Sequence, residues 1–146
     1  MNILIVQGPN LNLVGVRSAK SGEQITLDKI NRGLRKKANI RPEELNLKIL
    51  QTHKIEKVMT TIHRNRNWAN GIILAPMAWA RYEYALRDCL DTVAVPTIEV
   101  FLTDQYESEE DKVMSILSAV CMDSMSGHPL SIFTDALDRL VNHLTK

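Results

Sequence analysis

The sequence predicts a single α/β domain, residues 1–146, in which helices cover both faces of a parallel β-sheet. Short apolar runs rich in β-branched residues alternate with segments of helical spacing. The runs are apolar on both faces, as expected for central strands of a parallel sheet. Right-handed crossovers between such strands place helices on the two sides of the sheet. The composition, with 45% apolar and 24% charged residues, is that of a globular protein.

Five segments are predicted as strands. Four of them are the short apolar runs, residues 2–6, 47–50, 71–75 and 96–102. The fifth segment, residues 119–125, is more polar because it contains Asp123 and Ser124. We therefore expect the fifth strand to be weak.

Helices are predicted where apolar side chains recur every three or four positions. These segments are residues 27–38, 55–62, 82–90, 108–117 and 132–144. Thr26 precedes the first of them and is expected to cap its N-terminus. Ser108 and Asp111 are expected to form a capping pair at the start of the fourth. No internal repeat or linker interrupts this pattern, which agrees with one domain.

Charge and hydropathy exclude several functions. The chain has 18 basic and 17 acidic residues and a net charge of +1, whereas proteins that bind nucleic acid phosphates usually carry a larger basic excess. No apolar run reaches the roughly 18 residues that cross a bilayer, and the first residues have the pattern of a buried strand rather than a secretion signal. Cys89 and Cys121 are too far apart to form a metal site alone and suggest a reducing compartment. We expect a cytoplasmic protein that binds neither nucleic acid nor membranes.

The loops that follow the strands are expected to carry the functional site, because ligands of such folds bind beyond the carboxyl ends of the strands. The first loop, residues 8–17, lacks the glycine patterns of phosphate-binding loops. Asn10 and Asn12 can donate and accept hydrogen bonds there, and Arg17 can hold an anion. A structural turn with a surface arginine is the alternative interpretation.

Two further features lie near the expected site. Residues 17–24, here called the lid segment, are small and polar, and would form either a lid over the strand ends or an ordinary flexible connection. The four histidines show no metal-ligand spacing. Only His53, which directly follows a predicted strand, is expected to face the site.

Three stretches of the chain resemble the type II 3-dehydroquinate dehydratases: residues 8–17, Thr26 with Leu27, and residues 85–88. The resemblance runs nearly end to end, over residues 1–144, with few or no gaps. It implies a flavodoxin-like three-layer αβα fold with a five-stranded parallel sheet. It also implies assembly into trimers or dodecamers and a reaction without a cofactor.

The family's reaction is a carbon-acid elimination. A tyrosinate in the lid, whose pKa is lowered by a nearby arginine, removes a proton beside a ketone. An asparagine in the first loop and a bound water stabilise the enolate, and a histidine at the end of the fourth strand protonates the departing hydroxyl. General base, enolate stabilisation and general acid thus act in one pocket.

The resemblance assigns roles to five residues of this chain. Asn10 stands at the enolate-stabilising position, and Arg17 stands at the position of the arginine. Asp88 matches an aspartate that reaches the substrate of a neighbouring subunit. Thr103 replaces a serine that binds the substrate carboxylate, and Lys112 replaces an arginine of the substrate site.

Other family positions are changed. Gly22 stands where the family has its lid tyrosine, and Phe101 stands where it has its general-acid histidine. Arg81 replaces a histidine that binds a substrate hydroxyl. Ala75 replaces a substrate-binding asparagine, and residues 76–78 replace a segment whose glycine lets the backbone approach the carboxylate. Losing a positioned acid or base typically lowers a rate by about 10²–10⁴, so we expect ordinary dehydroquinate dehydration to be very slow.

The replacements favour a changed pocket over a decayed one. Several are expected to form an apolar wall, and others to keep the pocket cationic: Ala75, Met77, Trp79 and Phe101 for the wall, Arg17, Arg81 and Lys112 for the charge. We therefore favour a repurposed enzyme for an anionic or carbonyl-bearing small molecule with an apolar portion. Such a molecule would undergo elimination, isomerisation or cyclisation through an enolate-like intermediate, in specialised biosynthesis.

The predicted catalytic residues are Asn10, Arg17 and Tyr82. Tyr82 is the favoured base because the charge of the neighbouring Arg81 would lower a phenol pKa, although a core-facing helix residue is the plainer interpretation. Tyr106, Glu83 and His53 are the other candidates for proton transfer. The predicted substrate-binding residues are Ala75, Met77, Ala78, Arg81, Asp88, Phe101, Leu102, Thr103 and Lys112.

The expected partners are a small-molecule substrate and further copies of the chain, with no metal or other cofactor. Two alternatives to the repurposed enzyme remain. One is a non-catalytic ligand-binding paralogue, and the other is a 3-dehydroquinate dehydratase whose base is displaced.

Overall fold

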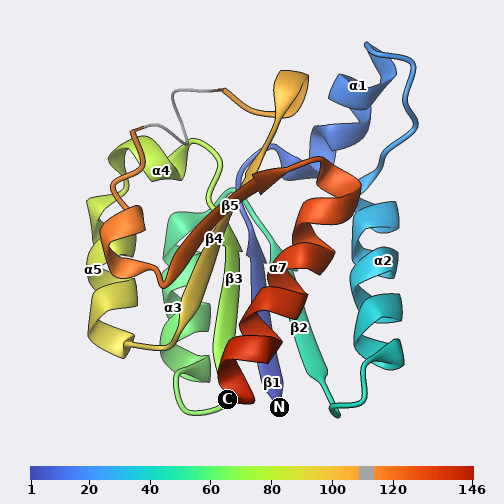
Figure 1. Ribbon diagram of the computed structural model, residues 1–146. Coiled ribbons are helices and arrows are strands. Elements are labelled where there is room, and N and C mark those ends of the chain that lie inside the picture. Colours follow the sequence, from blue (N-terminus) through green and yellow to red (C-terminus); the bar gives the residue numbers. More distant parts are fainter. Residues whose placement is uncertain (109–113) are drawn as a thin grey trace.

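The computed structural model describes residues 1–108 and 114–146 and contains one five-stranded parallel sheet (Figure 1). The strand order is β2-β1-β3-β4-β5, which is the flavodoxin-like order. The predicted fold class is therefore confirmed. The strands are β1 (Asn2–Gln7), β2 (Asn46–Gln51), β3 (Gly71–Ala75), β4 (Thr97–Leu102) and β5 (Asp123–Gly127).

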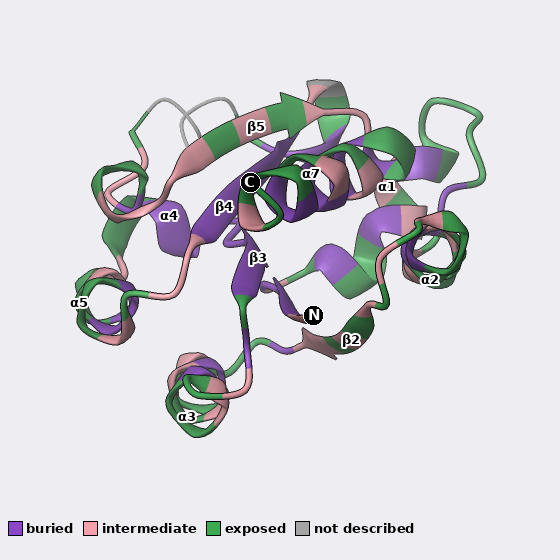
Figure 2. Ribbon diagram, turned by 60° about the horizontal axis from the view of Figure 1, so that its bottom comes forward, coloured by how far each residue is buried: buried purple, intermediate pink, exposed green. Residues whose placement is uncertain are grey.

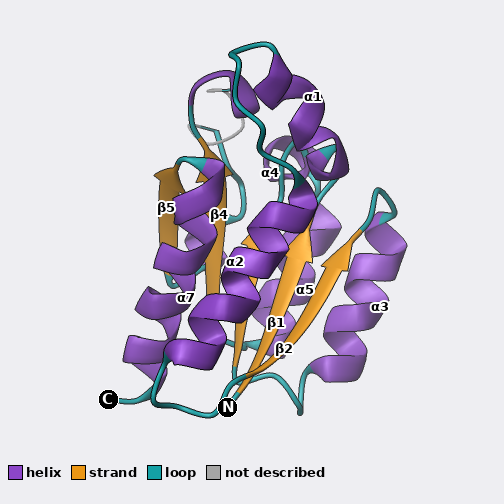
Figure 3. Ribbon diagram, turned by 90° about the vertical axis from the view of Figure 1, so that its right-hand side faces the viewer, coloured by secondary structure: helices purple, strands orange, loops and turns teal. Residues whose placement is uncertain are grey.

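Helices pack on both faces of the sheet and form the two outer layers, α2 and α7 on one side and α3 and α5 on the other (Figure 3). The α-helices are α1 (Val14–Ala19), α2 (Leu27–Ile40), α3 (Ile55–Asn65), α4 (Trp79–Tyr82), α5 (Tyr84–Val93) and α7 (Pro129–Leu144). Short 3-10 helices occur as η1 (Leu11–Leu13), η2 (Asp104–Tyr106) and η3 (Ser118–Val120).

Successive side chains along each strand point to opposite faces of the sheet, which creates two separate apolar cores. In β1, Ile3 and Ile5 pack in the core that α2 and α7 cover, whereas Leu4 and Val6 pack in the core that α3 and α5 cover. All residues of β3 and β4 are buried, as expected for central strands with helices on both faces (Figure 2). The sheet is thus a rigid support for the loops at its carboxyl end, while the two chain termini lie together at the opposite end (Figure 1).

Local sequence signals place the helix ends. The Thr26 hydroxyl accepts a hydrogen bond from the Lys29 amide at the start of α2, so the predicted cap is confirmed. Helix α7 starts with Pro129, and the His128 side chain accepts from the Leu130 amide. Both arrangements satisfy backbone donors that have no partner within the helix.

Three predicted elements differ in the structure. The fifth strand begins later than predicted, at Asp123, and its polar residues are tolerated because β5 is the edge of the sheet. The predicted helix over 82–90 is two helices, α4 and α5, separated by non-helical backbone at Glu83. Of the predicted helix over 108–117, residues 109–113 lie outside the described residues, and residues 115–117 are not helical.

A buried carboxylate explains why the chain around Ser115 is not helical. The side chain of Glu99 in β4 is fully buried, and it accepts hydrogen bonds from the hydroxyls of Ser115, Ser118 and Ser124. Burial and this negative charge raise the pKa of the Cys121 thiol to about 12, so the thiol stays protonated. A buried charge must be paired or hydrogen-bonded. Ser115 and Ser118 donate to the Glu99 carboxylate, and these hydrogen bonds hold residues 115–118 against the sheet.

Glu99→Gln tests this contribution to stability. The amide keeps the size of the carboxylate, but it presents one oxygen instead of two and adds donors that need acceptors. We expect the free energy of unfolding in urea to fall by about 1–3 kcal/mol. Glu44→Gln, at an exposed loop position, should change it by no more than about 0.5 kcal/mol. Equal stability of the two variants would show that the serine hydroxyls do not stabilise this carboxylate.

Candidate active site

The loops after β1 and β3 are in direct backbone contact at the carboxyl end of the sheet. The Gly8 amide donates to the Ala75 carbonyl at 2.8 Å. A Cβ atom at Gly8 would lie 2.8 Å from the carbonyl oxygens of both Ala75 and Pro76. Only glycine fits at such a distance, and the contact holds Pro9 and Asn10 beside the loop that follows β3.

A cavity of about 180 Å³ opens where these loops meet. Its walls come from the first loop, from α1, from residues 77–81 and from the segment after η2. The lining residues are Pro9, Asn10, Arg17, Met77, Ala78, Arg81, Glu107 and Ser108. Five of the predicted site residues are therefore together: Asn10, Arg17, Met77, Ala78 and Arg81.

Two lining residues have a left-handed backbone. Asn10 has φ 70° and Met77 has φ 53°. Asparagine adopts this conformation readily, whereas a residue such as methionine does so at a cost of about 1–2 kcal/mol. Met77 lies in the segment where the resemblance places a glycine, and its positive φ is a conformation that glycine adopts without strain. Strained residues of this kind are concentrated at functional sites.

His53, which was expected to face the site, contacts the first loop but does not line the cavity. Its Nδ1 atom accepts a hydrogen bond of 3.3 Å from the Asn10 backbone amide. His53 follows β2, so this contact ties the end of a third strand to the first loop.

The lid segment is hydrogen-bonded to η2. Arg17 donates to the Gln105 backbone carbonyl at 3.3 Å, and the side-chain amide of Gln105 (Nε2) donates to the Ser21 hydroxyl at 2.6 Å. Gly22 lies between these contacts and the next one, with φ 79° and no heavy atom near its missing Cβ. Gly22 thus has a backbone conformation that L side chains rarely adopt.

Glu23 forms the last contact of the lid segment. One of its carboxylate oxygens accepts a hydrogen bond from the Tyr106 hydroxyl, and the other lies 2.9 Å from His128 Nε2. The bonds from Tyr106 and His128 hold the pKa of Glu23 below its ordinary value, and burial raises the pKa of Tyr106. Tyr106 is buried and directed at Glu23, away from the cavity, so it is not placed for the proton transfer that we considered for it.

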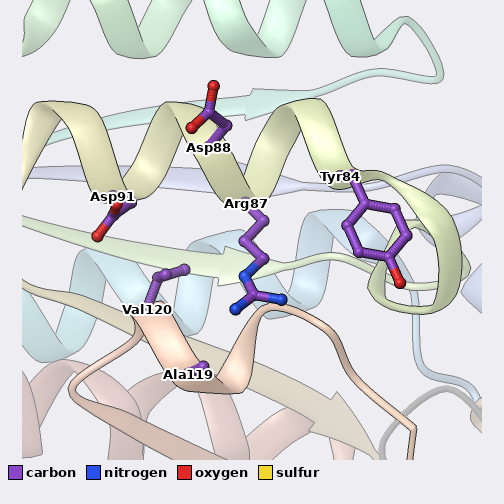
Figure 4. A pocket seen from close by; sticks show the side chains of 6 residues that line it. All are labelled: Tyr84, Arg87, Asp88, Asp91, Ala119 and Val120. Carbon is purple, nitrogen blue, oxygen red and sulfur yellow. The ribbon is translucent and has the colours of Figure 1, made fainter.

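Tyr82 and Asp88 lie outside this cavity. The Tyr82 side chain is 57% exposed and does not line the cavity, so the structure does not place it as a base. Asp88 lies with Arg87 at a second, more open hollow of about 500 Å³ between α5 and η3 (Figure 4). Within one chain, Asp88 is therefore not part of the Asn10 site.

The predicted apolar wall is only partly present. Ala75, Trp79 and Phe101 are buried in the protein and do not line the cavity, which leaves Met77 as the wall residue that does. The side chain of Leu102 packs in the core of α2 and α7, and the Thr103 amide donates to the Gly127 carbonyl. Lys112 lies outside the described residues. We expected these apolar side chains to give the cavity room for a large apolar group. Ala75, Trp79 and Phe101 fill the protein interior instead, so this expectation is wrong for the described lining of the cavity.

Sequence reasoning missed Glu107. This residue lines the cavity, is 5% exposed, and accepts a hydrogen bond of 2.9 Å from the Leu102 amide through Oε1. Glu107 begins an acidic run, residues 107–111, that is typical of a helix start, and no local signal distinguishes it from its neighbours. Among the described residues, no group of His, Cys, Asp and Glu is arranged to hold a metal ion.

The strand order is that of flavodoxin-like α/β proteins, and the cavity with Asn10 and Arg17 lies at the carboxyl end of the sheet, where such folds bind their ligands. The class II dehydroquinase family model matches residues 1–141, so the chain belongs to that family. Curated relatives include the 3-dehydroquinate dehydratases of Dictyoglomus turgidum, 31% identical over 146 residues (100% of this chain, 99% of the relative), and of Clostridium botulinum, 29% identical over 145 residues (99% and 97%). The crystal structure of a type II dehydroquinase from Butyrivibrio crossotus superposes with a TM-score of 0.85 at 26% identity, covering 97% of each chain.

Tyr106→Phe tests the fastening of the lid segment. Without the hydroxyl, we expect faster amide hydrogen exchange in residues 21–23, because Glu23 loses its hydrogen bond from Tyr106. A carboxyl with a lowered folded pKa adds stability above its unfolded pKa, and this stability is lost as pH falls through the lower folded value. The decrease in thermal stability on acidification below the ordinary Glu pKa should therefore be smaller in the variant.

Tyr84→Phe is the matched control, because the Tyr84 side chain is 63% exposed. This variant should keep the exchange rates and the acid dependence of the unchanged chain. If Tyr106→Phe also kept both, the contact with Glu23 would not hold the lid segment in solution.

Proposed function

We propose that this chain is a lyase-like enzyme that binds a small anionic carbonyl compound between Asn10, Arg17 and Arg81 and stabilises an enolate-like intermediate there. The observation that carries this proposal is the convergence of these three residues, from three separate segments, on one cavity. Guanidinium groups bind carboxylates through paired hydrogen bonds. Amide and guanidinium donors that are already in place stabilise an oxyanion as its charge develops.

The size of the cavity limits the ligand. At about 180 Å³, it is smaller than the roughly 300–1,000 Å³ of sites for drug-sized ligands. Pro9, Met77 and Ala78 provide a short apolar surface beside the charged groups. A compact ring or short chain with one carbonyl and one carboxylate fits this description, with only a small apolar portion.

Proton transfer is where the proposed chemistry departs from that of the family. Gly22 and Phe101 cannot act as base or acid, and each missing group typically lowers the rate by about 10²–10⁴. These two residues support a repurposed reaction such as elimination, isomerisation or cyclisation, within specialised biosynthesis. The same two residues favour the alternative of a paralogue that binds its ligand without turning it over.

A second candidate function is 3-dehydroquinate dehydration itself. The observation that favours it is the name shared by curated relatives of 29–31% identity over the full length of this chain. It requires a base and an acid at new positions, since the positions of the family's tyrosine and histidine hold Gly22 and Phe101.

Arg17→Ala tests the proposed site with 3-dehydroquinate as the probe. We expect calorimetric titration to show binding weakened by about 10-fold or more, because a charged hydrogen-bond donor is removed. Arg32→Ala is the matched control, since Arg32 lies on the exposed face of α2 and pairs with Asp28; it should leave binding unchanged. Equal binding by the Arg17 variant and the unchanged chain would refute the proposed site.

The rate of dehydroshikimate formation from 3-dehydroquinate separates the candidates. A rate at least about 10²-fold below that of the Dictyoglomus turgidum relative is expected for the repurposed enzyme. A rate equal to that of the relative would establish the second candidate instead.

We also propose that the chain forms a homo-oligomer through the hollow lined by Arg87 and Asp88. Tyr84, Arg87, Asp88 and Asp91 present an aromatic ring and charges of both signs at an open surface (Figure 4). Aromatic residues and arginine are enriched in protein interfaces, and by resemblance Asp88 reaches a neighbouring subunit.

The cytoplasm remains the proposed location. None of the helices in the described parts of the chain is long and apolar enough to span a membrane.

Arg87→Glu tests the interface. Reversing the charge places a third carboxylate beside Asp88 and Asp91, so we expect the mass from sedimentation equilibrium to fall from that of an oligomer toward 16.5 kDa. Arg64→Glu, on α3, should keep the mass of the unchanged chain. A chain that is already a monomer at this mass would contradict the proposal.

A further inference from the structure

Strand β2 forms one edge of the sheet, and its outer side has no neighbouring strand among the described residues. The Asn46 and Thr52 amides donate to carbonyls on the β1 side. Because successive backbone groups of a strand point to opposite sides, the amides and carbonyls of Leu47, Ile49 and Gln51 point away from β1. No described residue accepts a hydrogen bond from these three amides. These outward backbone groups are here called the β2 edge.

The positive charge of the chain is unevenly distributed. Residues 27–66, which contain α2, β2 and α3, have 11 of the 18 basic residues and 4 of the 17 acidic ones. Their formal net charge is therefore +7, whereas the remaining residues together carry −6. Strand β2 lies between α2 and α3 (Figure 3), so the three elements that carry this excess are together on one side of the sheet.

Two cations lie on the two faces of the strand, beside its edge. Arg35 of α2 lines a hollow of about 290 Å³ together with Asn46 and Leu47. The exposed Lys48 points to the opposite face from Leu47 and donates to Asn65 of α3 at 2.8 Å. Neither Arg35 nor Lys48 forms an ion pair with a described residue. A strand added beside β2 would direct alternate side chains to these two faces, so acidic side chains would meet a positive charge on each.

The chemistry of this surface favours a peptide over a nucleic acid. A peptide backbone has both donors and acceptors, so it can pair with the outward amides and with the outward carbonyls of the β2 edge. Phosphate oxygens only accept hydrogen bonds and would leave the carbonyls unpaired. Residues 27–66 also contain no Phe, Tyr or Trp on which bases could stack.

A second copy of this chain matches the β2 edge less well than an acidic peptide does. Two β2 edges side by side would bring together two regions of net charge +7, and like charges oppose association. The opposite edge of the sheet, β5, contains one acidic residue, Asp123, which already pairs with Arg139 at 3.2 Å. Neither edge of another copy therefore offers free carboxylates to the β2 edge.

We propose that the β2 edge binds an acidic, extended segment of another protein, which adds to the sheet as a sixth strand beside β2. Backbone pairing holds the segment, and carboxylates directed to Arg35 and Lys48 distinguish it from other extended chains. Neither of these two residues lines the cavity that contains Asn10 and Arg17, so the proposal is independent of the proposed function.

A synthetic peptide with the pattern Glu-Glu-Thr-Thr-Glu-Glu, capped at both ends, tests the proposal. It matches the six residues of β2 in length and carries carboxylates on both faces of a strand. We expect the amide resonances of Leu47, Ile49 and Gln51 to move on titration. Their hydrogen exchange should slow by at least about 10-fold, because each amide gains an acceptor.

Two control peptides separate charge from backbone pairing. The lysine counterpart, Lys-Lys-Thr-Thr-Lys-Lys, should bind at least about 10-fold more weakly because its charge is reversed. The acidic peptide with both threonine amides methylated keeps its charge but lacks a donor on either side of the strand. It should also bind at least about 10-fold more weakly.

Arg35→Gln and Lys48→Gln, made separately, test the two cations. Each should weaken binding of the acidic peptide by at least about threefold, because one charged partner is lost. Arg139→Gln is the matched control, since it removes one positive charge at the β5 edge, and it should bind within about twofold of the unchanged chain. All three side chains are exposed, so none of these variants should unfold the chain.

No measurable binding of the acidic peptide, no response of the three β2-edge amides, or equal binding of the methylated peptide would overturn the proposal. Tighter binding of a single-stranded oligothymidylate of the same charge would identify a nucleic-acid surface instead. Hydrogen exchange of the three amides that slows as the free chain is concentrated would show that a second copy covers the edge. Either of these two results would also reject an acidic peptide as the partner.

Discussion

The close approach of Gly8 to the backbone of Ala75 and Pro76 determines where the functional residues lie. It extends the pairing of β1 with β3 by one residue beyond the pair Gln7 and Ala75, into the loops themselves. A side chain at position 8 would meet two carbonyl oxygens at 2.8 Å and separate the loops. Asn10 would then lose its place beside Met77 and Ala78, and the cavity would lose one wall.

Much of the fold could be predicted because its signals are local. Apolar runs such as residues 71–75 have the composition of buried parallel strands, and Thr26 is a cap that operates within four residues. The loops at the strand ends follow from the topology, which brings Asn10, Arg17 and Arg81 to one edge of the sheet.

The rest of the site could not be predicted because its contacts join distant segments. Tyr106 meets Glu23 across 83 positions, and His128 meets Glu23 across 105. Nothing near Tyr106 in the sequence indicates that its hydroxyl is directed away from the cavity. Phe101 shows the same limit, since a changed family residue was expected to reshape the cavity wall but fills the protein interior.

Family membership and the glycine at position 22 are compatible because the fold and the lid segment depend on different parts of the chain. The sheet and its two cores are formed by side chains that face the helices, and they hold the strand ends in place whatever the loops contain. Gly22 lies in a loop with no heavy atom near its missing Cβ, so a change there leaves the packing intact. The fold therefore tolerates a glycine at position 22 without a change in either core.

Two arginines, Arg17 and Arg81, line one small cavity, and their like charges destabilise the folded state unless other groups compensate them. Like charges at close range raise the free energy of the folded state, and the effect grows as water is excluded. The backbone carbonyl of Gln105 accepts from Arg17, and the carboxylate of Glu107 lies at the same cavity as Arg81. These groups make the folded state less dependent on a bound anion.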